Sequence, residues 1–330
     1  MKKEKVYHLK TWPKVLLVVL IFIGALSYYL KGKYDEYIYH NSYEYKILEL
    51  GYKMEDYNLL RNKLTDDELN VILEKGYDEF IPMFVKTKYF MFKNLDGYLS
   101  QVITQNEDFF KYHGVEGYDY DHIVALVNTH SITSPYTGGY KTDFTKGYGI
   151  LANKYYELGS DYAPDDLVNI PLKYYYGDKK TIRQEVFDAF VNMWEAANQE
   201  GIYLIVDSGY RAYDKQLEVY NYYQDYKGTK YADSIAARPG YSEHQTGLAL
   251  DIYSKECTVA NEFPNTKTYE WLINNSYKYG FVLRYPKDKQ DITGYNYESW
   301  HYRYLGVDLA TKVYNEGITF DEYYAFYLDN

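Results

Sequence analysis

The sequence predicts an α+β fold in which a small antiparallel sheet is flanked by helices and preceded by an apolar helix and a helical spacer. Residues 15–30 form an apolar run without a charged residue. Residues 181–200 carry a broad apolar face at helical spacing. Residues 202–206 are nearly all apolar, which is typical of a strand covered on both sides. Residues 248–252 alternate between large apolar and other side chains, which is the period of a strand.

Composition restricts the classes of function. The 330 residues suffice for one large or two modest domains, and a hydrophobic content of 46% is that of a globular protein. The net charge of −11 leaves no basic stripe to release counterions, so we expect no nucleic-acid partner. Cys257 is the one cysteine, which excludes an intramolecular disulfide and a cysteine-rich zinc finger. The sequence gives no indication of oligomeric state.

The N-terminal segment, residues 1–33, predicts a cytoplasmic tail and a transmembrane anchor. At about 1.5 Å per residue its apolar run is slightly short for a bilayer core of about 30 Å, and Trp12 and Tyr28 could extend it as interfacial anchors. The lysines concentrate before the run, which favours an extracellular location for the rest of the chain. The alternative is a cleaved signal peptide and a secreted protein, because Ala25-Leu26-Ser27 resembles a cleavage site.

The next two regions are predicted to hold no catalytic group. Residues 34–110 show short helical patterns, and Thr65 followed by Glu68 is typical of a capped helix start, so we expect a helical spacer. Residues 111–173 are punctuated by glycine and proline and are predicted to be a connector, within which residues 124–127 are strand-like.

Two imidazoles and one carboxylate in the last region are candidate metal ligands: His244, Asp251 and His301. On a strand, Asp251 shares a face with Gly247 and Ala249, whose small size would leave room for a ligand. His244 follows a turn and could fold back onto that face. Catalytic zinc sites commonly use three protein ligands of these kinds and leave the fourth position for water.

A second carboxylate, Glu298, precedes His301 by three residues. On a straight strand these two side chains would point to opposite faces, so we expect a turn or bulge between them, with Trp300 packing away from the metal. Taken alone, the pair is more typical of a charged loop that enters an apolar strand than of a metal site.

Several spaced motifs together resemble the VanY-type D-alanyl-D-alanine carboxypeptidase family. They are Ser242-x-His244-x-x-Gly247-x-Ala249-x-Asp251, Glu298-x-Trp300-His301, Ser208-Gly209-Tyr210-Arg211, Arg238-Pro239-Gly240 and Tyr279-Gly280-Phe281-x-Leu283-Arg284-Tyr285-Pro286. The resemblance covers roughly residues 174–306 and leaves residues 1–110 outside it. Related zinc folds also include binding domains, as in hedgehog proteins.

The resemblance implies a zinc carboxypeptidase domain over residues 174–330. It implies Zn²⁺ bound by His244, Asp251 and His301, and Glu298 as the base that activates the attacking water. It also implies that Arg211, assisted by Ser242, holds the free C-terminal carboxylate of a peptide, whereas the alternative for Arg211 is a structural salt bridge.

The function implied is removal of the terminal D-alanine from peptidoglycan stem peptides. An L,D-carboxypeptidase acting on tetrapeptide stems would keep the same residues. A non-catalytic zinc-bearing module would bind the wall without hydrolysis. In this setting residues 34–110 are a spacer or a wall-interaction region.

Overall fold

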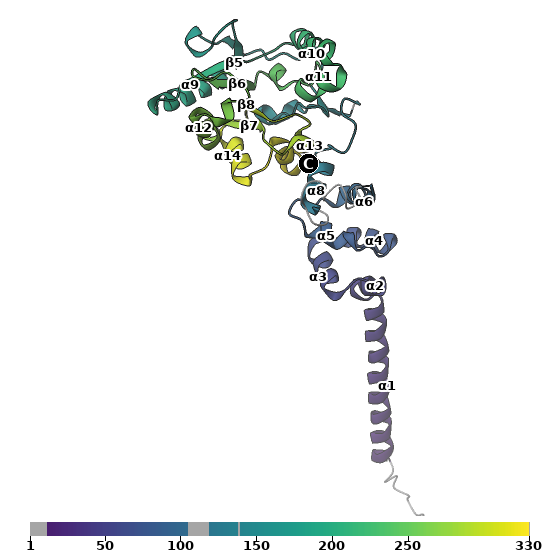
Figure 1. The fold of residues 1–330 in the computed structure, drawn as a ribbon. Coiled ribbons are helices and arrows are strands. Elements are labelled where there is room, and N and C mark those ends of the chain that lie inside the picture. The colour runs from purple at the N-terminus through teal and green to yellow at the C-terminus, as the bar shows by residue number, and fades with distance from the viewer. Residues whose placement is uncertain (1–11, 105–118, 138, 330) are drawn as a thin grey trace, which may run out of the picture. The chain divides into compact units, whose positions relative to one another are not determined.

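The structure, a computed structural model, describes residues 12–104, 119–137 and 139–329 (Figure 1). The chain divides into two compact units, Met1–Leu99 and Ser100–Asn330. The boundary between the units falls inside a helix. The sequence instead predicts a boundary between residues 110 and 111, and these two residues lie outside the described ones. The predicted ranges of the spacer and connector stay predictions.

The first unit begins with the long helix α1 (Trp12–His40), none of whose side chains is buried. An 18-residue window in α1 has a mean hydropathy of 2.1, so the helix is long and apolar enough to cross a membrane, as a signal sequence also would be. The helix continues beyond Lys33, the predicted end of the anchor. Four of the N-terminal lysines lie outside the described residues: Lys2, Lys3, Lys5 and Lys10.

Short helices with a core of their own make up the rest of the first unit. They are α2 (Tyr43–Glu49), α3 (Met54–Lys63), α4 (Asp66–Lys75), α5 (Phe80–Lys86), the 3₁₀ turn η1 (Phe92–Asn94) and the start of α6 (Leu95–Thr104). Ile47, Leu60 and Ile72 are fully buried in this core. The predicted cap at Thr65 is confirmed, because its side chain accepts from the Glu68 N–H while Glu68 bonds back to the Thr65 N–H.

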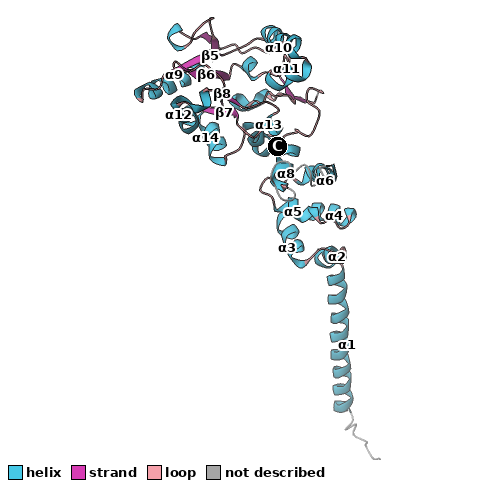
Figure 2. Cartoon of the chain, in the orientation of Figure 1, coloured by secondary structure: helices cyan, strands magenta, loops and turns pink. Residues whose placement is uncertain are grey.

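A four-stranded antiparallel sheet forms the centre of the second unit, as the sequence predicts (Figures 1 and 2). Its strand order is β5-β6-β8-β7, and every neighbouring pair is antiparallel. The bounds are β5 (Leu204–Ser208), β6 (Ala249–Ser254), β7 (Phe281–Tyr285) and β8 (Glu298–Tyr304). Two further strand pairs lie outside this sheet: β1 (Tyr140–Lys141) with β2 (Tyr156–Glu157), and β3 (Leu167–Asn169) with β4 (Thr181–Arg183).

Helices α9 (Gln184–Gln199) and α12 (Lys267–Asn275) pack into the main core together with the sheet. Alternate strand residues supply this core, among them Leu250 and Ile252 of β6 and Tyr302 of β8. Leu250 and Ile252 thus lie in the core as the predicted alternation requires, whereas Ala249 and Asp251 are not part of it. All six residues of β6 are nevertheless buried, and Tyr253 also packs into the core.

Within the described residues, the other α-helices of the second unit are α8 (Tyr120–Asn128), α10 (Tyr213–Lys227), α11 (Thr229–Ile235), α13 (Gln290–Thr293), α14 (Val307–Glu316) and α15 (Phe320–Tyr323). A single π-helical turn, Tyr324–Leu328, follows α15. The strand expected at residues 124–127 is wrong, since these residues lie in α8, whose N-terminus Asp119 caps. A short apolar run that is buried on all sides does not distinguish a helix from a strand.

Gly280 ends the 3₁₀ turn η6 (Ser276–Tyr279) immediately before β7 and has a φ of +89°. A Cβ added there would lie 2.6 Å from Cε2 of Tyr304, whereas one added at Gly317, with φ of +68°, would meet nothing within 4 Å. We expect Gly317→Ala to cost about 1–2 kcal/mol, the cost of a left-handed residue. Gly280→Ala should cost about 1–3 kcal/mol more, because the core must also move.

Thermal unfolding of the two variants of the full chain in detergent measures this difference. Equal losses of stability would show that the approach of Tyr304 to Gly280 does not constrain the start of β7.

Candidate metal centre

The pairing of β6 with β8 brings two of the candidate ligands together. Asp251 lies directly opposite His301 in this antiparallel register. Directly opposed residues project from the same face of a sheet. The distance from Nδ1 of His301 to Oδ1 of Asp251 is 3.0 Å.

His244 reaches the same place from the 3₁₀ turn η4 (Glu243–Thr246), which immediately precedes β6. Its Nδ1 donates to the carbonyl of Gly209 at 2.7 Å, so Nε2 is the nitrogen left to act as a ligand. That Nε2 lies 3.4 Å from Oδ2 of Asp251. The backbone N–H of Arg211 in turn donates to the His244 carbonyl, which ties the turn to the end of β5.

The three groups form a site with the chemistry of a zinc centre. One ligand atom from each of His244, Asp251 and His301 lies within 4.8 Å of the others, and all three residues are buried. Two imidazoles and a carboxylate are a donor set that zinc accepts, whereas calcium and magnesium prefer oxygen ligands alone. The residues present therefore fit Zn²⁺.

The pKa values of these groups are strongly perturbed. Burial lowers the pKa of His244, which favours the neutral imidazole that binds metal. Burial alone would raise the pKa of Asp251, but the two histidines outweigh it and hold the pKa well below its usual range. Burial lowers the pKa of His301, but hydrogen bonds to Asp251 and Glu243 raise it to about 9 overall. Metal binding therefore competes with protonation of His301.

Glu298 joins the cluster because β8 is bulged, as the sequence predicts. Leu283 of β7 pairs with Tyr302, but Tyr285 pairs with Glu298, so the register shifts between these pairs. The shift brings Oε2 of Glu298 to 3.7 Å from Nδ1 of His301. Burial raises the pKa of Glu298 to about 7.

Arg211 and Ser242 border the same cavity of about 190 Å³ as the three candidate ligands and Glu298. The Arg211 guanidinium donates to Oε1 of Gln216 and to Oγ of Ser208, both at 3.0 Å. Among the described residues it has no carboxylate within ion-pair distance. The structure thus gives no support to the salt-bridge alternative, and the cation faces a cavity in which an anion could bind.

Two local expectations need correction. Gly247 does not leave room for a ligand, since an added Cβ would lie 2.8 Å from Cγ of Arg183 and the residue has a left-handed φ of +65°. Neither Gly247 nor Ala249 borders the cavity. Trp300 does border it, while its ring also stacks on Tyr253 of the core at a centroid distance of 5.9 Å.

Sequence reasoning assigned no role to Glu243, although it lies inside the quoted motif beside His244. In the structure it is buried and contacts His301, Arg284 and Arg303. The signal was indirect: two arginines occur within the apolar strand patterns of β7 and β8, and buried arginines require anionic partners.

Comparisons with known proteins identify the family of the region that carries this site. The family model "VanY: D-alanyl-D-alanine carboxypeptidase" matches residues 179–307. "Putative carboxypeptidase YodJ" of Bacillus subtilis is 42% identical over 53% of this chain and 66% of its own length. A D-alanyl-D-alanine carboxypeptidase of Enterococcus faecalis is 43% identical over 40% of this chain and 51% of its own length. The chain thus spans between half and two thirds of these two relatives.

A shorter relative is matched almost completely. The bifunctional D-Ala-D-Ala dipeptidase and carboxypeptidase VanXYC of Enterococcus gallinarum is 33% identical over 53% of this chain and 93% of its own length. Among solved structures, the LdcB LD-carboxypeptidase is 39% identical, with a TM-score of 0.54 over 58% of this chain and 92% of that chain. A VanY structure in complex with Zn(II) is 36% identical, with a TM-score of 0.45 over 53% of this chain and 98% of that chain.

Asp251 provides a direct test of the metal centre. We expect Asp251→Ala to weaken zinc binding by about 100-fold or more, because removing a ligand costs at least as much as removing a group that orients one. Competition with a chromogenic chelator measures the dissociation constant. Asp207→Asn is the matched control, since Asp207 is a nearby carboxylate on β5 outside the ligand cluster. Equal affinities in the two variants would contradict the site.

Proposed function

Because the chain belongs to the VanY family of D-alanyl-D-alanine carboxypeptidases, we propose that it is a zinc-dependent D,D-carboxypeptidase that removes the terminal D-alanine from peptidoglycan stem peptides. The observation that carries this proposal is the convergence on one cavity of three zinc-type donors, the free carboxylate of Glu298 and the cation of Arg211. Each of these groups has a distinct part in hydrolysing a peptide bond at a chain end.

His244, Asp251 and His301 hold the metal in this proposal. Bound there, Zn²⁺ supplies Lewis-acid chemistry that polarises the scissile carbonyl and makes water more acidic. The chain's contribution is to present the three donors from a rigid sheet and an adjoining turn, so that the reacting peptide bond meets a preformed cluster.

Glu298 is the general base. Its side chain lies beside the ligand cluster and borders the cavity, so it can accept a proton from the attacking water at the carbonyl carbon. The raised pKa of Glu298 makes the protonated form a competent acid, which can then return the proton to the departing D-alanine amine.

Arg211 restricts the reaction to a chain end. A guanidinium binds a carboxylate through two parallel hydrogen bonds, and in the proposed complex its partner is the C-terminal carboxylate of the stem peptide. Gln216 and Ser208 hold the fork in place, and Ser242 lies on the same cavity wall. A peptide without a free carboxylate would leave Arg211 without an anionic partner.

The second candidate function is that of an L,D-carboxypeptidase on tetrapeptide stems. It is favoured by the similarity to LdcB, which covers most of that chain. Both activities use the same catalytic residues and differ in the stereochemistry that the cavity accepts. Incubation of the full chain with pentapeptide and tetrapeptide stems, followed by mass spectrometry, separates the two functions, and a wall-binding module would release alanine from neither.

In the proposed topology, α1 anchors the chain in the membrane and the carboxypeptidase domain lies outside the cell. The length and composition of α1 and the lysines that precede it support this arrangement. N-terminal sequencing of membrane and secreted fractions distinguishes the anchored form from one cleaved after Ser27.

Glu298→Gln should retain zinc and lose turnover by a factor of about 10²–10⁴, because the amide cannot accept the proton. Release of D-alanine by the full chain and zinc content measure the two properties separately. Glu256→Gln, a change at an exposed carboxylate after β6, is the control and should leave both unchanged. Undiminished turnover in Glu298→Gln would refute its role as base.

Arg211 is tested by changing substrate and enzyme together. We expect the wild type to prefer a free C-terminal acid over the matching amide by a factor of about 10–100 in kcat/KM, equivalent to about 1.5–3 kcal/mol for a hydrogen bond to a charged group. Arg211→Met should abolish that preference, because the variant lacks the cation that binds the carboxylate of the acid and finds no anion on the amide. A preference that survives in Arg211→Met would assign recognition of the carboxylate to another residue.

A further inference from the structure

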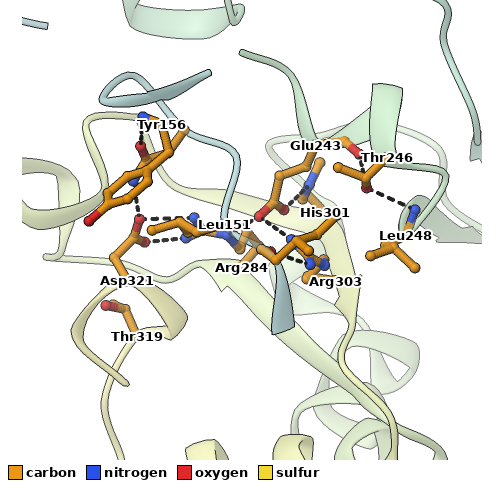
Figure 3. A network of polar contacts seen from close by, with 12 residues as sticks. Leu151, Tyr156, Glu243, Thr246, Leu248, Arg284, His301, Arg303, Thr319 and Asp321 are labelled. Carbon is orange, nitrogen blue, oxygen red and sulfur yellow. Dashed lines mark hydrogen bonds and ion pairs between the residues drawn. The ribbon is translucent and has the colours of Figure 1, made fainter. Parts of the chain in front are cut away.

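A network of four charged side chains lies fully buried behind the metal centre (Figure 3). Its cations are Arg284 of β7 and Arg303 of β8, and its anions are Glu243 and Asp321 of α15. None is more than 2% exposed. Burying charges is costly even when they are paired, so the placement of this network beside a catalytic cavity calls for a reason beyond stability.

Glu243 uses its two oxygens for different partners. Oε1 accepts from Nε of Arg284 at 2.7 Å and from Nη1 of Arg303 at 2.8 Å. Oε2 lies 3.4 Å from Nε2 of His301. Figure 3 shows the carboxylate between the two arginines and the imidazole. Burial would raise the pKa of Glu243, but the two guanidiniums outweigh it and hold the pKa well below its usual range.

His301 therefore has a different partner on each ring nitrogen. Nδ1 faces the cluster, 3.0 Å from Asp251 and 3.7 Å from Glu298, while Nε2 faces away from it toward Glu243. His244 is arranged in the opposite sense, because its Nδ1 is occupied by the Gly209 carbonyl and its Nε2 faces the cluster. Each histidine that lines the site thus has a hydrogen-bond acceptor behind it.

We propose that Glu243 is a positioning residue: it accepts a hydrogen bond from Nε2–H of His301 and so directs the lone pair of Nδ1 to the metal. This inference rests on the proposed metal site and assigns a role to a residue that does not touch the ion. A carboxylate behind a ligand histidine fixes its tautomer and ring orientation and makes the ligand nitrogen more basic. Arg284 and Arg303 keep that carboxylate charged and fixed.

Glu243→Gln tests the proposal because the amide cannot satisfy all three neighbours. The two guanidiniums are donors and will take the amide oxygen, which turns the amide NH₂ toward Nε2 of His301. That nitrogen must then accept, and the ring proton moves to Nδ1, where it opposes metal binding. We expect zinc affinity to fall about 10–100-fold.

Asp321→Asn is the matched control. Asp321 pairs with Arg284 in the same network, including a bond from Nη2 to Oδ1 of 2.9 Å, but it does not contact His301. Both variants remove one buried negative charge and should lower the unfolding temperature. Only Glu243→Gln should weaken zinc binding, measured by chelator competition on the full chain in detergent. Equal zinc affinities in the two variants would reduce Glu243 to a structural role.

Two further measurements cover the remaining outcomes. If Glu243→Gln does not fold, Glu243→Gln combined with Arg303→Met removes one charge of each sign, and the same loss of zinc affinity is expected. In the zinc-loaded wild type with ¹⁵N-labelled histidine, NMR should show His301 as the Nε2–H tautomer. A proton on Nδ1 would overturn the proposal.

These readouts do not depend on turnover. A chain that binds zinc through His301 but releases no alanine would refute the proposed function and leave the role of Glu243 intact. Normal turnover together with unchanged zinc affinity in Glu243→Gln would refute the positioning role of Glu243 and leave the proposed function intact.

Discussion

The hydrogen-bonded register between β6 and β8 is the constraint on which the rest of the site depends. It sets Asp251 opposite His301, and the same alternation sends Leu250, Ile252 and Tyr302 into the apolar core. A slip of one residue would exchange the two faces of a strand, burying the ligands among apolar side chains. The core therefore stabilises the register that the site needs. Any pairing that separates Asp251 from His301 would lose the free energy of burying the apolar face of the sheet.

The bulge in β8 places the proposed base, Glu298, by the same principle. A regular strand would place Glu298 and His301 on opposite faces, whereas the shifted register near Tyr285 brings both to the cavity. Bulges bend a strand and redirect a side chain at the cost of a local break in the ladder. Here that break lets β8 carry both a candidate ligand, His301, and the proposed base, Glu298. The other two candidate ligands come from β6 and from the turn that precedes it.

The sequence was informative where function depends on spacing along one strand or turn. The alternation of β6, the strand end before Arg211 and the irregularity between Glu298 and His301 were all predictable, since each is a local pattern. The role of Glu243 was not, because its partners Arg284 and Arg303 are distant in sequence and only the sheet brings them together. The strand prediction for residues 124–127 failed for a different reason: a short run that is buried on every side carries no periodicity.

The carboxylates around His301 differ in whether they have a guanidinium partner. Asp251, Glu243 and Glu298 all lie close to His301. Of these three carboxylates, only Glu243 has guanidinium partners, and Arg284 and Arg303 both contact its Oε1, the oxygen farther from His301. Among the described residues, Asp251 and Glu298 have no guanidinium within ion-pair distance, so their nearest cationic partners are the histidines and any metal held between them. A cation that binds there relieves repulsion among buried anions, and metal binding should therefore be coupled to the stability of the β6–β8 pair.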